Sequence, residues 1–506
     1  MSRVFEIIDL FAGPGGLGEG FSAVGKEGAT RMKIRLSVEM EKDAVRTLRL
    51  RAFLRSFENG FPPEYYQAIN SGNPFPDWAE LYPKHWKSAE QEARQMELGK
   101  PGVFEEISSV LDASREKLHG DTILIGGPPC QAYSLVGRAR NKGKSGYVAE
   151  ADHRHYLYRE YVRILDRLRP AIFVMENVKG MLSSKVDGGE IFQHVLEDLR
   201  HAGDGYTLLP LAQPLRDGGP DARDFIVKAE EHGIPQERHR VFVVGLRSDF
   251  SPPSGKRPLL EKSTQGLPVS VQQAIFDLPR LRSRLSKGDD GTCQKAWQAA
   301  VMEQAQRMAS HPDVAEDLKS RVKAIIQEGF EEVSNAFSMN GFTRPENMPD
   351  ELRAWLRDDR LSTILHHETR GHKPSDLGRY LFAAVMGEVR DQSPRLRDFP
   401  EFLQPDHKNR ESGKFQDRFK VQRAGRASST ITSHIKKDGH YYIHPDPSQV
   451  RSLTTREAAR LQTFPDNYYF CGSDLKFRNG ARLHQVGNAV PPLLASKIAT
   501  ALGRLM

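Results

Sequence analysis

The sequence predicts an α/β protein built around a parallel sheet, and three stretches carry that prediction. Residues 4–21 read as a strand, a glycine-rich turn and a helix. Residues 121–125 form an apolar run that ends in Gly-Gly-Pro-Pro-Cys, and residues 172–175 form a second run that ends in Glu-Asn-Val. Because ligands and catalytic groups collect at the carboxyl ends of parallel strands, both strand ends are candidate parts of an active site.

Length and composition set the class of protein. A chain of 506 residues suggests two domains or one large elaborated one, and 38% hydrophobic with 27% charged residues is typical of a soluble globular protein. No apolar run approaches the ~18 residues of a membrane span. The first strand begins at Val4, which leaves no room for a signal peptide, so we expect a cytoplasmic protein.

Cysteines and net charge narrow the chemistry only slightly. Cys130, Cys293 and Cys471 are widely separated, which excludes a disulfide framework and a zinc site. Lys plus Arg number 73 against 66 Asp plus Glu, giving a formal charge of +7. That excess permits a polyanionic partner such as DNA without demanding one.

The glycine-rich turn after the first strand predicts a nucleotide-type cofactor. Gly13, Gly15 and Gly18 have the G-x-G-x-x-G spacing, and Glu39 ends a second apolar strand about twenty residues later. In dinucleotide sites such an acid binds the ribose hydroxyls, and the same geometry serves S-adenosylmethionine. This segment alone does not separate NAD from S-adenosylmethionine.

Residues 126–134, GGPPCQAYS, present Cys130 at a strand end. Two consecutive prolines stiffen the backbone and remove two amide donors, so the cysteine has little conformational freedom. A structural cysteine usually lies inside an apolar element, which favours a nucleophile here. The basic loop that follows, residues 134–146, is suited to closing over a phosphate backbone, although an ordinary solvated loop has the same composition.

Glu176 is the second candidate catalytic group. Residues 155–169 have apolar residues at helical spacing, Pro170 ends that helix, and the following strand runs into Glu176. A glutamate at the end of a buried strand is costly unless it faces a cleft or is paired, and a cleft position suits a proton donor. A structural glutamate bonded to a neighbouring loop is the alternative.

Residues 233–247, GIPQERHRVFVVGLR, predict another strand with polar residues at its start. Gln236, Arg238 and Arg240 alternate, so an extended backbone places them on one face. Two arginines on a cleft are able to hold a pyrimidine oxygen and a phosphate. A surface edge strand of alternating polarity is the competing interpretation.

From about residue 254 to residue 450 the sequence no longer shows the alternation of strand and helix patterns. Residues 295–337 predict amphipathic helices, and the rest reads as irregular. Residues 408–444 interleave Lys and Arg with aromatic residues, a mixture that suits phosphate contact with base readout. We interpret His366, His367 and His372 as solvated or DNA-facing, since no ligand set completes a metal site. Residues 453–465 then predict a threonine-capped helix, and residues 485–492 open the last helix.

Several of these segments together resemble one family. The Pro-Pro-Cys-Gln loop, Asp9-Leu-Phe-Ala-Gly13, Glu176-Asn-Val and Gln-x-Arg-x-Arg resemble the DNA (cytosine-5-)methyltransferases of bacterial restriction–modification systems, in that family's order. The resemblance implies a Rossmann-like class I S-adenosylmethionine-dependent sheet in residues 1–255, completed by residues 470–506. It also implies an irregular target-recognition domain in residues 256–469, organised by residues 451–466.

The resemblance also implies roles for individual residues. Catalytic roles fall on Cys130, Glu176, Arg238 and Arg240. Cofactor contacts fall on Phe11, Gly13, Gly15, Glu39, Met40, Glu106, Ile107, Pro128, Leu157, Asn488 and Ala489. Among these, Glu106 and Ile107 come from a degraded match, because the chain reads Glu105-Glu-Ile where the family has Gly-Asp-Ile.

The implied reaction transfers a methyl group from S-adenosylmethionine to C5 of a flipped-out cytosine, without a metal. Cys130 adds to C6 and makes C5 nucleophilic, because cytosine C5 is otherwise unreactive. The implied partner is double-stranded DNA, with a restriction endonuclease acting separately. We expect a monomer on DNA, associated with the bacterial nucleoid and not with a membrane.

Three other functions compete with this one. A tRNA cytosine-5 methyltransferase shares the chemistry, but that branch is compact, and a region of nearly two hundred residues after 254 favours duplex DNA. A NAD-dependent oxidoreductase explains the glycine spacing and leaves Pro-Pro-Cys-Gln and Gln-x-Arg-x-Arg unexplained. A catalytically inactive DNA-binding member would not need Cys130 and Glu176.

Overall fold

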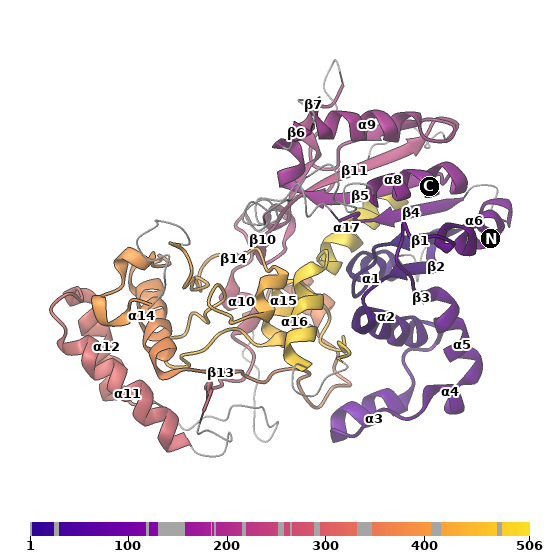
Figure 1. Cartoon of the computed structure of the whole chain (residues 1–506). Helices are drawn as coiled ribbons and strands as arrows, with labels where there is room; N and C mark the ends of the chain where they lie inside the picture. Colours follow the sequence, from indigo (N-terminus) through magenta and orange to yellow (C-terminus); the bar gives the residue numbers. More distant parts are fainter. Residues whose placement is uncertain are drawn as a thin grey trace.

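The computed structural model describes residues 3–24, 30–117, 121–129, 157–183, 185–186, 189–214, 219–250, 258–263, 266–287, 294–330, 347–405, 416–472 and 478–506. Figure 1 shows a part that contains the large sheet and a helical part, with the yellow helices of the chain's end between them. Within these ranges, every helix is too short or too polar to cross a membrane.

The sheet confirms the predicted α/β class. It has eight strands, and its main path runs β3-β2-β1-β4-β5-β11-β8, with β9 pairing β11. Strands β3, β2, β1, β4 and β5 are parallel, whereas β11 is antiparallel to both neighbours. The strand bounds are β1 Arg3–Leu10, β2 Thr30–Glu39, β3 Ala93–Gln95, β4 Thr122–Gly126, β5 Ile172–Val178, β8 Tyr206–Leu209, β9 Ile226–Lys228 and β11 His239–Arg247.

Both faces of the sheet are covered, which is why its central strands are continuously apolar. Ile123 and Ile125 of β4 face one core, with helices α1 (Gly16–Ala23) and α17 (Pro492–Gly503). Leu124 faces the other, with α6 (Val103–Lys117), α8 (Leu157–Leu168) and α9 (Ile191–His201). The predicted helix at 155–169 is thus confirmed over its described residues. Helix α17, near the end of the chain, packs closely against α1, near its start, because a Cβ on Gly20 would lie 2.4 Å from the carbonyl oxygen of Pro492.

Three short helices are inserted between α2 (Lys42–Arg55) and β3, and we call residues 56–92 the aromatic insertion. They are α3 (Pro63–Ser71), α4 (Trp78–Leu81) and α5 (Pro83–Glu92), and their aromatic side chains pack on Phe53. The insertion also contacts a segment three hundred residues away. The Tyr66 hydroxyl donates to Asp358 at 2.7 Å, and the Asn70 side chain bonds to the backbone of Arg360 and Ser362 at 2.9 Å each.

The helical part, which we call the helical lobe, has its own core. It comprises α11 (Gln294–Ser310), α12 (Glu316–Glu328) and α14 (Pro374–Arg390), with loops that include Phe419 and Val421. Helices α11 and α12 confirm the helical prediction for the described part of 295–337. The expectation of irregular structure elsewhere was wrong for α14, a 17-residue helix whose buried positions extend around much of its surface. Shorter elements elsewhere in the described chain are α10 (Val271–Ile275), α13 (Asp350–Leu356), β10 (Gln236–Glu237), β12 (Arg284–Leu285), β13 (Gly371–His372) and β14 (Ser428–Ser429).

A polar core lies between the sheet and the helical lobe, and we call residues 449–466 the junction. It contains α15 (Thr455–Leu461), whose predicted threonine cap is confirmed because the Thr454 hydroxyl accepts the Glu457 N–H. Arg451 makes a bidentate ion pair with Glu457 at 2.6 and 2.7 Å. Arg460 does the same with Asp466 at 2.8 and 2.9 Å and also binds Asp277. These groups are buried, so the junction is held by paired charges.

The histidines near residue 370 belong to this buried region, so the expectation that they are solvated or DNA-facing was wrong. His366, His367 and His372 are each at most 8% exposed. The Phe470 N–H donates to His366 Nε2 at 3.0 Å, and His367 Nε2 lies 2.8 Å from the carbonyl oxygen of Pro279. Burial lowers the pKa of His367 to about 4, so it is neutral and serves packing.

Candidate active site

The glycine turn after β1 has the backbone that the sequence pattern predicts. Gly13 and Gly15 have φ values of +56° and +96°, and Phe11 has a φ of 54°, which is uncommon for a residue with a side chain. A Cβ added to Gly13 would meet no atom within 4 Å of the described chain, whereas one on Gly15 would lie 2.9 Å from Leu48. The turn is therefore packed on one side and open at Gly13.

Glu39 closes this turn from the neighbouring strand. Its carboxylate accepts the N–H groups of Gly13 at 2.8 Å, Met40 at 2.9 Å and Glu41 at 2.8 Å. Burial raises the pKa of Glu39, and the three donors oppose that rise. The adjacent Met40 side chain is 53% exposed. The strand end thus holds a carboxylate in a fixed orientation beside an open glycine.

A second carboxyl group lies on β1 itself. Asp9 is fully buried, and neither of its carboxylate oxygens has a hydrogen-bond partner in the part of the chain that the structure describes. Ser37, its register partner on β2, likewise leaves its hydroxyl without one there. Burial raises the pKa of Asp9 well above its ordinary value. Strands β1 and β2 therefore carry polar groups that the described chain does not satisfy.

The ends of β4 and β5 meet as the sequence predicts. Gly126 pairs with Met175 in register, and a Cβ added to Gly127 would lie 2.9 Å from Glu176 Oε2. The Asn177 side chain donates to the carbonyl oxygen of Pro128 at 3.2 Å. The loop that leads to Cys130 therefore starts directly against Glu176. Cys130 itself and the basic loop 134–146 lie outside the described residues.

Glu176 is paired with Arg240 across the antiparallel strands β5 and β11. Arg240 Nε lies 3.0 Å from Glu176 Oε1, and the two side chains are only 16% and 13% exposed. Burial lowers the pKa of Arg240, and the neighbouring carboxylate opposes this. An acid and a guanidinium held side by side offer complementary hydrogen-bond groups to one planar polar ligand.

Arg238 does not join this pair. Its Nη1 donates to the carbonyl oxygen of Ile431 at 2.9 Å, and burial, together with the charge of Arg240, lowers its pKa. Gln236 is used similarly, because its side chain bonds to the backbone of Leu461 and Ile431. The alternating face predicted for these residues therefore divides, with Arg240 at Glu176, Arg238 at Ile431, and Gln236 between Ile431 and Leu461 of the junction.

The end of the chain returns to the glycine turn. A Cβ on Gly16 would lie 2.2 Å from the carbonyl oxygen of Val490 and 3.2 Å from Ala489 Cβ. Asn488 ends α16 (Arg478–Asn488), is exposed, and bonds to His484 at 3.2 Å. The structure thus brings Ala489 and Val490 to the first turn of α1, next to Asn488 in the chain, as the sequence order suggested.

Glu106 and Ile107 do not lie at a strand end. They lie in α6, where Glu106 is exposed and Ile107 is fully buried in the core. The strand that ends beside Glu39 is β3, and the acid that follows it is Glu97, with the Met96 N–H bonded to the Glu39 carbonyl oxygen at 2.9 Å. β3 consists of only three residues, Ala-Arg-Gln, without an apolar pattern, so this strand could not be predicted from the sequence. Leu157 is half-buried at the start of α8.

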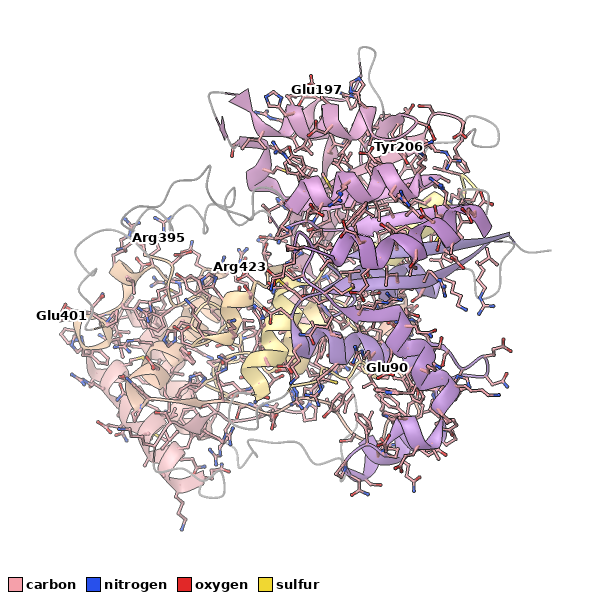
Figure 2. The ribbon with its side chains drawn as sticks, turned by 45° about the vertical axis from the view of Figure 1, so that its right-hand side comes forward. Glu90, Glu197, Tyr206, Arg395, Glu401 and Arg423 are labelled. Atoms are coloured by element: carbon pink, nitrogen blue, oxygen red, sulfur yellow. The ribbon has the colours of Figure 1, made fainter. Side chains whose placement is uncertain are left out.

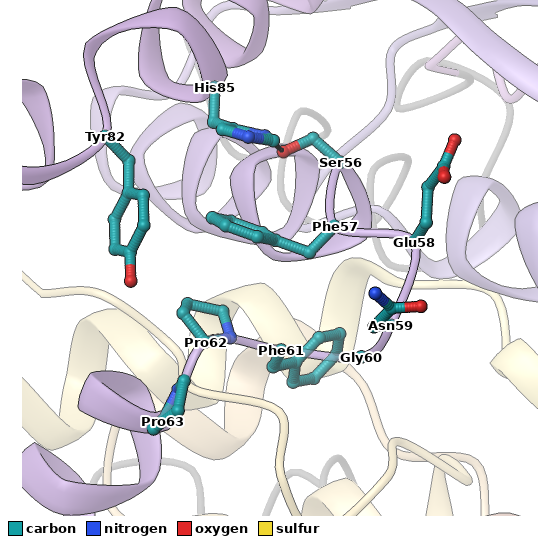
Figure 3. Close-up of a pocket in the computed structure, with 10 residues that line it drawn as sticks. All are labelled: Ser56, Phe57, Glu58, Asn59, Gly60, Phe61, Pro62, Pro63, Tyr82 and His85. Atoms are coloured by element: carbon teal, nitrogen blue, oxygen red, sulfur yellow. Dashed lines mark hydrogen bonds between the residues drawn. The ribbon is translucent and has the colours of Figure 1, made fainter.

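Figure 3 shows a pocket away from this edge, in the aromatic insertion. Phe57, Phe61, Tyr82 and His85 line it, and the His85 and Phe57 rings are stacked at 4.1 Å. It follows the C-terminal end of α2, whose 14 residues span roughly 20 Å from the helix start near Glu39. The pocket therefore belongs to the packing of the insertion and not to the strand-end site.

Comparisons with known proteins agree with this geometry. Residues 99–504 match the family model described as C-5 cytosine-specific DNA methylase. The chain is 32% identical to the type II methyltransferase M.Bpa9945I of Bacillus paralicheniformis, over 98% of each chain. It is 26% identical to the DNA (cytosine-5-)-methyltransferase M.ApeKI of Aeropyrum pernix, over 76% of this chain and 81% of that one.

A solved structure supports the fold. A prophage-encoded DNA modification methyltransferase of E. coli superposes with a TM-score of 0.51 at 20% identity, covering 99% of each chain. The match extends over the sheet and the helical lobe alike. With the matched family model covering most of the chain, the conclusion is that this protein belongs to the C-5 cytosine-specific DNA methylase family and has its α/β methyltransferase fold.

Proposed function

We propose that this chain uses S-adenosylmethionine to methylate C5 of cytosine within one short sequence of double-stranded DNA, as the modification enzyme of a type II restriction–modification system. The observation that carries the proposal is the Glu176–Arg240 pair against Gly127, at the start of the Pro-Pro-Cys loop. A carboxyl group and a guanidinium match the N3 and O2 positions of one cytosine edge.

The edge formed by β1 and β2 fits S-adenosylmethionine. Gly13 leaves open space, Glu39 presents a fixed carboxylate for the ribose hydroxyls, and Phe11 precedes Gly13 in the same turn with its backbone held at positive φ. Pro128, Leu157, Asn488, Ala489 and exposed Met40 complete the proposed cofactor set, with Glu97 in the place given to Glu106. When bound, the cofactor supplies an electrophilic methyl group.

The chain's own groups prepare the cytosine. The Cys130 thiolate adds to C6, and the electron pair of the C5–C6 bond moves toward N3 and C5. Glu176 hydrogen-bonds or protonates N3, and Arg240 holds O2, so the charge that develops on the ring is stabilised. After methylation, loss of the C5 proton to a base regenerates the C5–C6 double bond and expels the thiolate. Arg238 supports this site through the backbone of Ile431.

The helical lobe and its loops are proposed as the target-recognition domain, within residues 256–469, and residues 1–255 with 470–506 as the catalytic domain. A cytosine inside a duplex must be flipped out, at a cost of a few kcal/mol, and contacts outside the catalytic sheet supply that energy. We expect the enzyme to act as a cytoplasmic monomer on DNA, separate from its endonuclease.

Bisulfite sequencing of plasmid DNA from cells that express the protein tests the proposal. We expect protected cytosines at one short motif. Cys130→Ala is expected to abolish protection while DNA binding persists, because only the nucleophile is removed. Turnover by Cys130→Ala at the wild-type rate would contradict the covalent mechanism. Methylated tRNA together with unprotected plasmid would instead establish the RNA branch of this chemistry.

A further inference from the structure

The helical lobe carries a turn with two arginines, residues 423–426, which we call the arginine turn. Its sequence is Arg-Ala-Gly-Arg, and the Arg426 N–H donates to the Arg423 carbonyl oxygen at 3.3 Å. Gly425 and Arg426 are exposed, and a Cβ on Gly425 would meet no atom of the described chain within 4 Å. The tip of the turn therefore projects into open space.

The base of the arginine turn is fixed on both sides. The Gln422 side chain is 1% exposed and crosses the base, accepting the Ser429 N–H at 2.9 Å and donating to the carbonyl oxygen of Tyr441. The first residues of α10 donate their N–H groups to the carbonyl oxygens of Ala424 and Arg426, at 2.9 and 2.7 Å. A turn held in this way presents its side chains with little loss of entropy on binding.

One carboxylate orients both guanidinium groups. Arg426 Nε donates to Asp391 Oδ2 at 3.0 Å, and Arg423 Nη1 lies 3.7 Å from the same oxygen. Asp391 itself follows the last residue of α14 with a left-handed φ of 50°. The Arg426 side chain is 60% exposed, and its two Nη groups have no hydrogen-bond partner in the described ranges. The bond to Asp391 therefore holds Arg426 through Nε and leaves the two Nη groups of its largely exposed side chain for a further partner.

We propose that Arg426, oriented by Asp391, reads a guanine in the target sequence. This inference rests on the proposed function. A guanine presents two acceptors, O6 and N7, in the major groove, and a guanidinium with two free coplanar donors matches them. A phosphate needs no such buttress, because its oxygens accept from many directions. A lysine in this position would lack the bidentate fork.

The turn is joined directly to the catalytic strands. Ser428 pairs with Gln236 at the start of the strand segment that leads to Arg240. Six residues separate the two arginines along this ladder, which is at most roughly 20 Å at ~3.3 Å per residue. That span covers about six base steps of 3.4 Å. Figure 2 shows Arg423 and Arg395 along one edge of the helical lobe.

A purely structural role for the arginines makes a different prediction. Positive charge at the C-terminal end of α14 stabilises the helix, since the last carbonyl groups carry partial negative charge. The Arg423 side chain does contact the Asp391 carbonyl oxygen at 3.4 Å. In that case removal of Arg426 lowers stability and leaves the target sequence unchanged.

The test uses a duplex library with randomised bases around the methylated cytosine, read by bisulfite sequencing after treatment with purified full-length enzyme. Wild type is compared with Arg426→Ala, Arg426→Lys and Asp391→Asn, and Arg397→Ala is the control, because Arg397 is an exposed arginine of the same lobe. We expect one required guanine to become degenerate in both Arg426 variants. Discrimination at that position should fall roughly tenfold to hundredfold. Asp391→Asn should lose part of it, and Arg397→Ala none.

A base analogue tests the same contact without altering the protein. Replacing the required guanine by 7-deazaguanine removes N7, so wild type should lose activity on that duplex while Arg426→Ala shows no further loss. An unchanged motif in Arg426→Ala, with activity lowered equally on every sequence, overturns the inference and leaves the proposed function standing. Failure of wild type to methylate any DNA overturns both.

Discussion

The ends of β1 and β2, which we call the cofactor edge because they form the proposed cofactor site, and the junction both bury charged groups. The two regions satisfy these groups in opposite ways. At the edge, Glu39 is held by backbone N–H groups, Asp9 has no partner among the described residues, and Gly13 faces open space. At the junction, Arg451 and Arg460 are each matched by bidentate carboxylates. A buried charge left available suits a ligand, whereas a buried charge that is fully paired specifies how two parts of a protein meet.

The largest expected effect comes from breaking a junction pair. Arg460→Met leaves Asp277 and Asp466 buried with one strong partner removed, so it should cost about 3–5 kcal/mol of stability. Urea unfolding measures this. Arg397→Met, at a side chain 71% exposed, should change stability by less than about 0.5 kcal/mol. If the two variants unfold alike, the paired charges of the junction do not hold the two parts of the protein together.

A fall in pH should lower the contribution of the junction to folding stability and raise that of the cofactor edge. Burial lowers the pKa of His367 to about 4 and that of His444 to about 3, so below the unfolded value near 6.5 the unfolded chain binds protons that the folded chain excludes. Stability is then lost as pH falls from about 6.5 toward 4, on the order of 2 kcal/mol per histidine by pH 5. The raised pKa values of Asp9 and Glu39 act oppositely, giving stability that is present near pH 4 and lost as pH rises through the folded values.

Thermal melting between pH 7 and 5 separates these contributions. His367→Gln should flatten the slope, because glutamine keeps polar atoms near Pro279 and Thr454 and does not titrate in this range. A slope identical to wild type would show that His367 does not cause the loss of stability at acidic pH. The same scan on Glu39→Gln should show a steeper loss of stability toward pH 5, because the opposing contribution of Glu39 is removed.

The smallest effect is expected at the cofactor edge, and it should appear in binding and not in stability. Glu39→Gln removes one charged acceptor, so we expect S-adenosylmethionine to bind about tenfold more weakly by calorimetry, or ~1.4 kcal/mol. Glu41→Gln is the matched control, since Glu41 is exposed beside it and is not a proposed cofactor contact. Equal affinities in the two variants would place the ribose elsewhere.

The sequence predicted the sheet strands that are long and apolar, together with the groups at their ends. Glu39 and Glu176 end such strands, and the motif order led correctly to Ala489 and Val490 beside the glycine turn. The prediction failed where local pattern carries no information. β3 has only three residues, and no pattern in the sequence predicts it. Arg238 alternates with Arg240 in sequence, yet a contact with Ile431, 193 residues away, decides where it points.

The burial of the histidines and of α14 also could not be predicted from the local sequence. A polar residue looks solvated in a sequence unless its partners are known, and the partners of His367 lie 88 and 87 residues away. Helix α14 is buried over much of its surface, so it lacks the one-sided apolar stripe that marks a surface helix.

The contacts of the aromatic insertion bear on how the specificity of this enzyme is transplanted. A chimaera that takes residues 256–450 from a relative also exchanges Asp358, Arg360 and Ser362, while Tyr66 and Asn70 stay with the host. The Tyr66 hydroxyl and the Asn70 amide then face residues of the donor protein that do not match them. The same holds for the Tyr66 ring, on which Arg360 stacks at 4.4 Å. The exchangeable unit is therefore discontinuous: a graft needs the host's residues 358–362, or it must carry the donor's residues 56–92 along with the recognition segment.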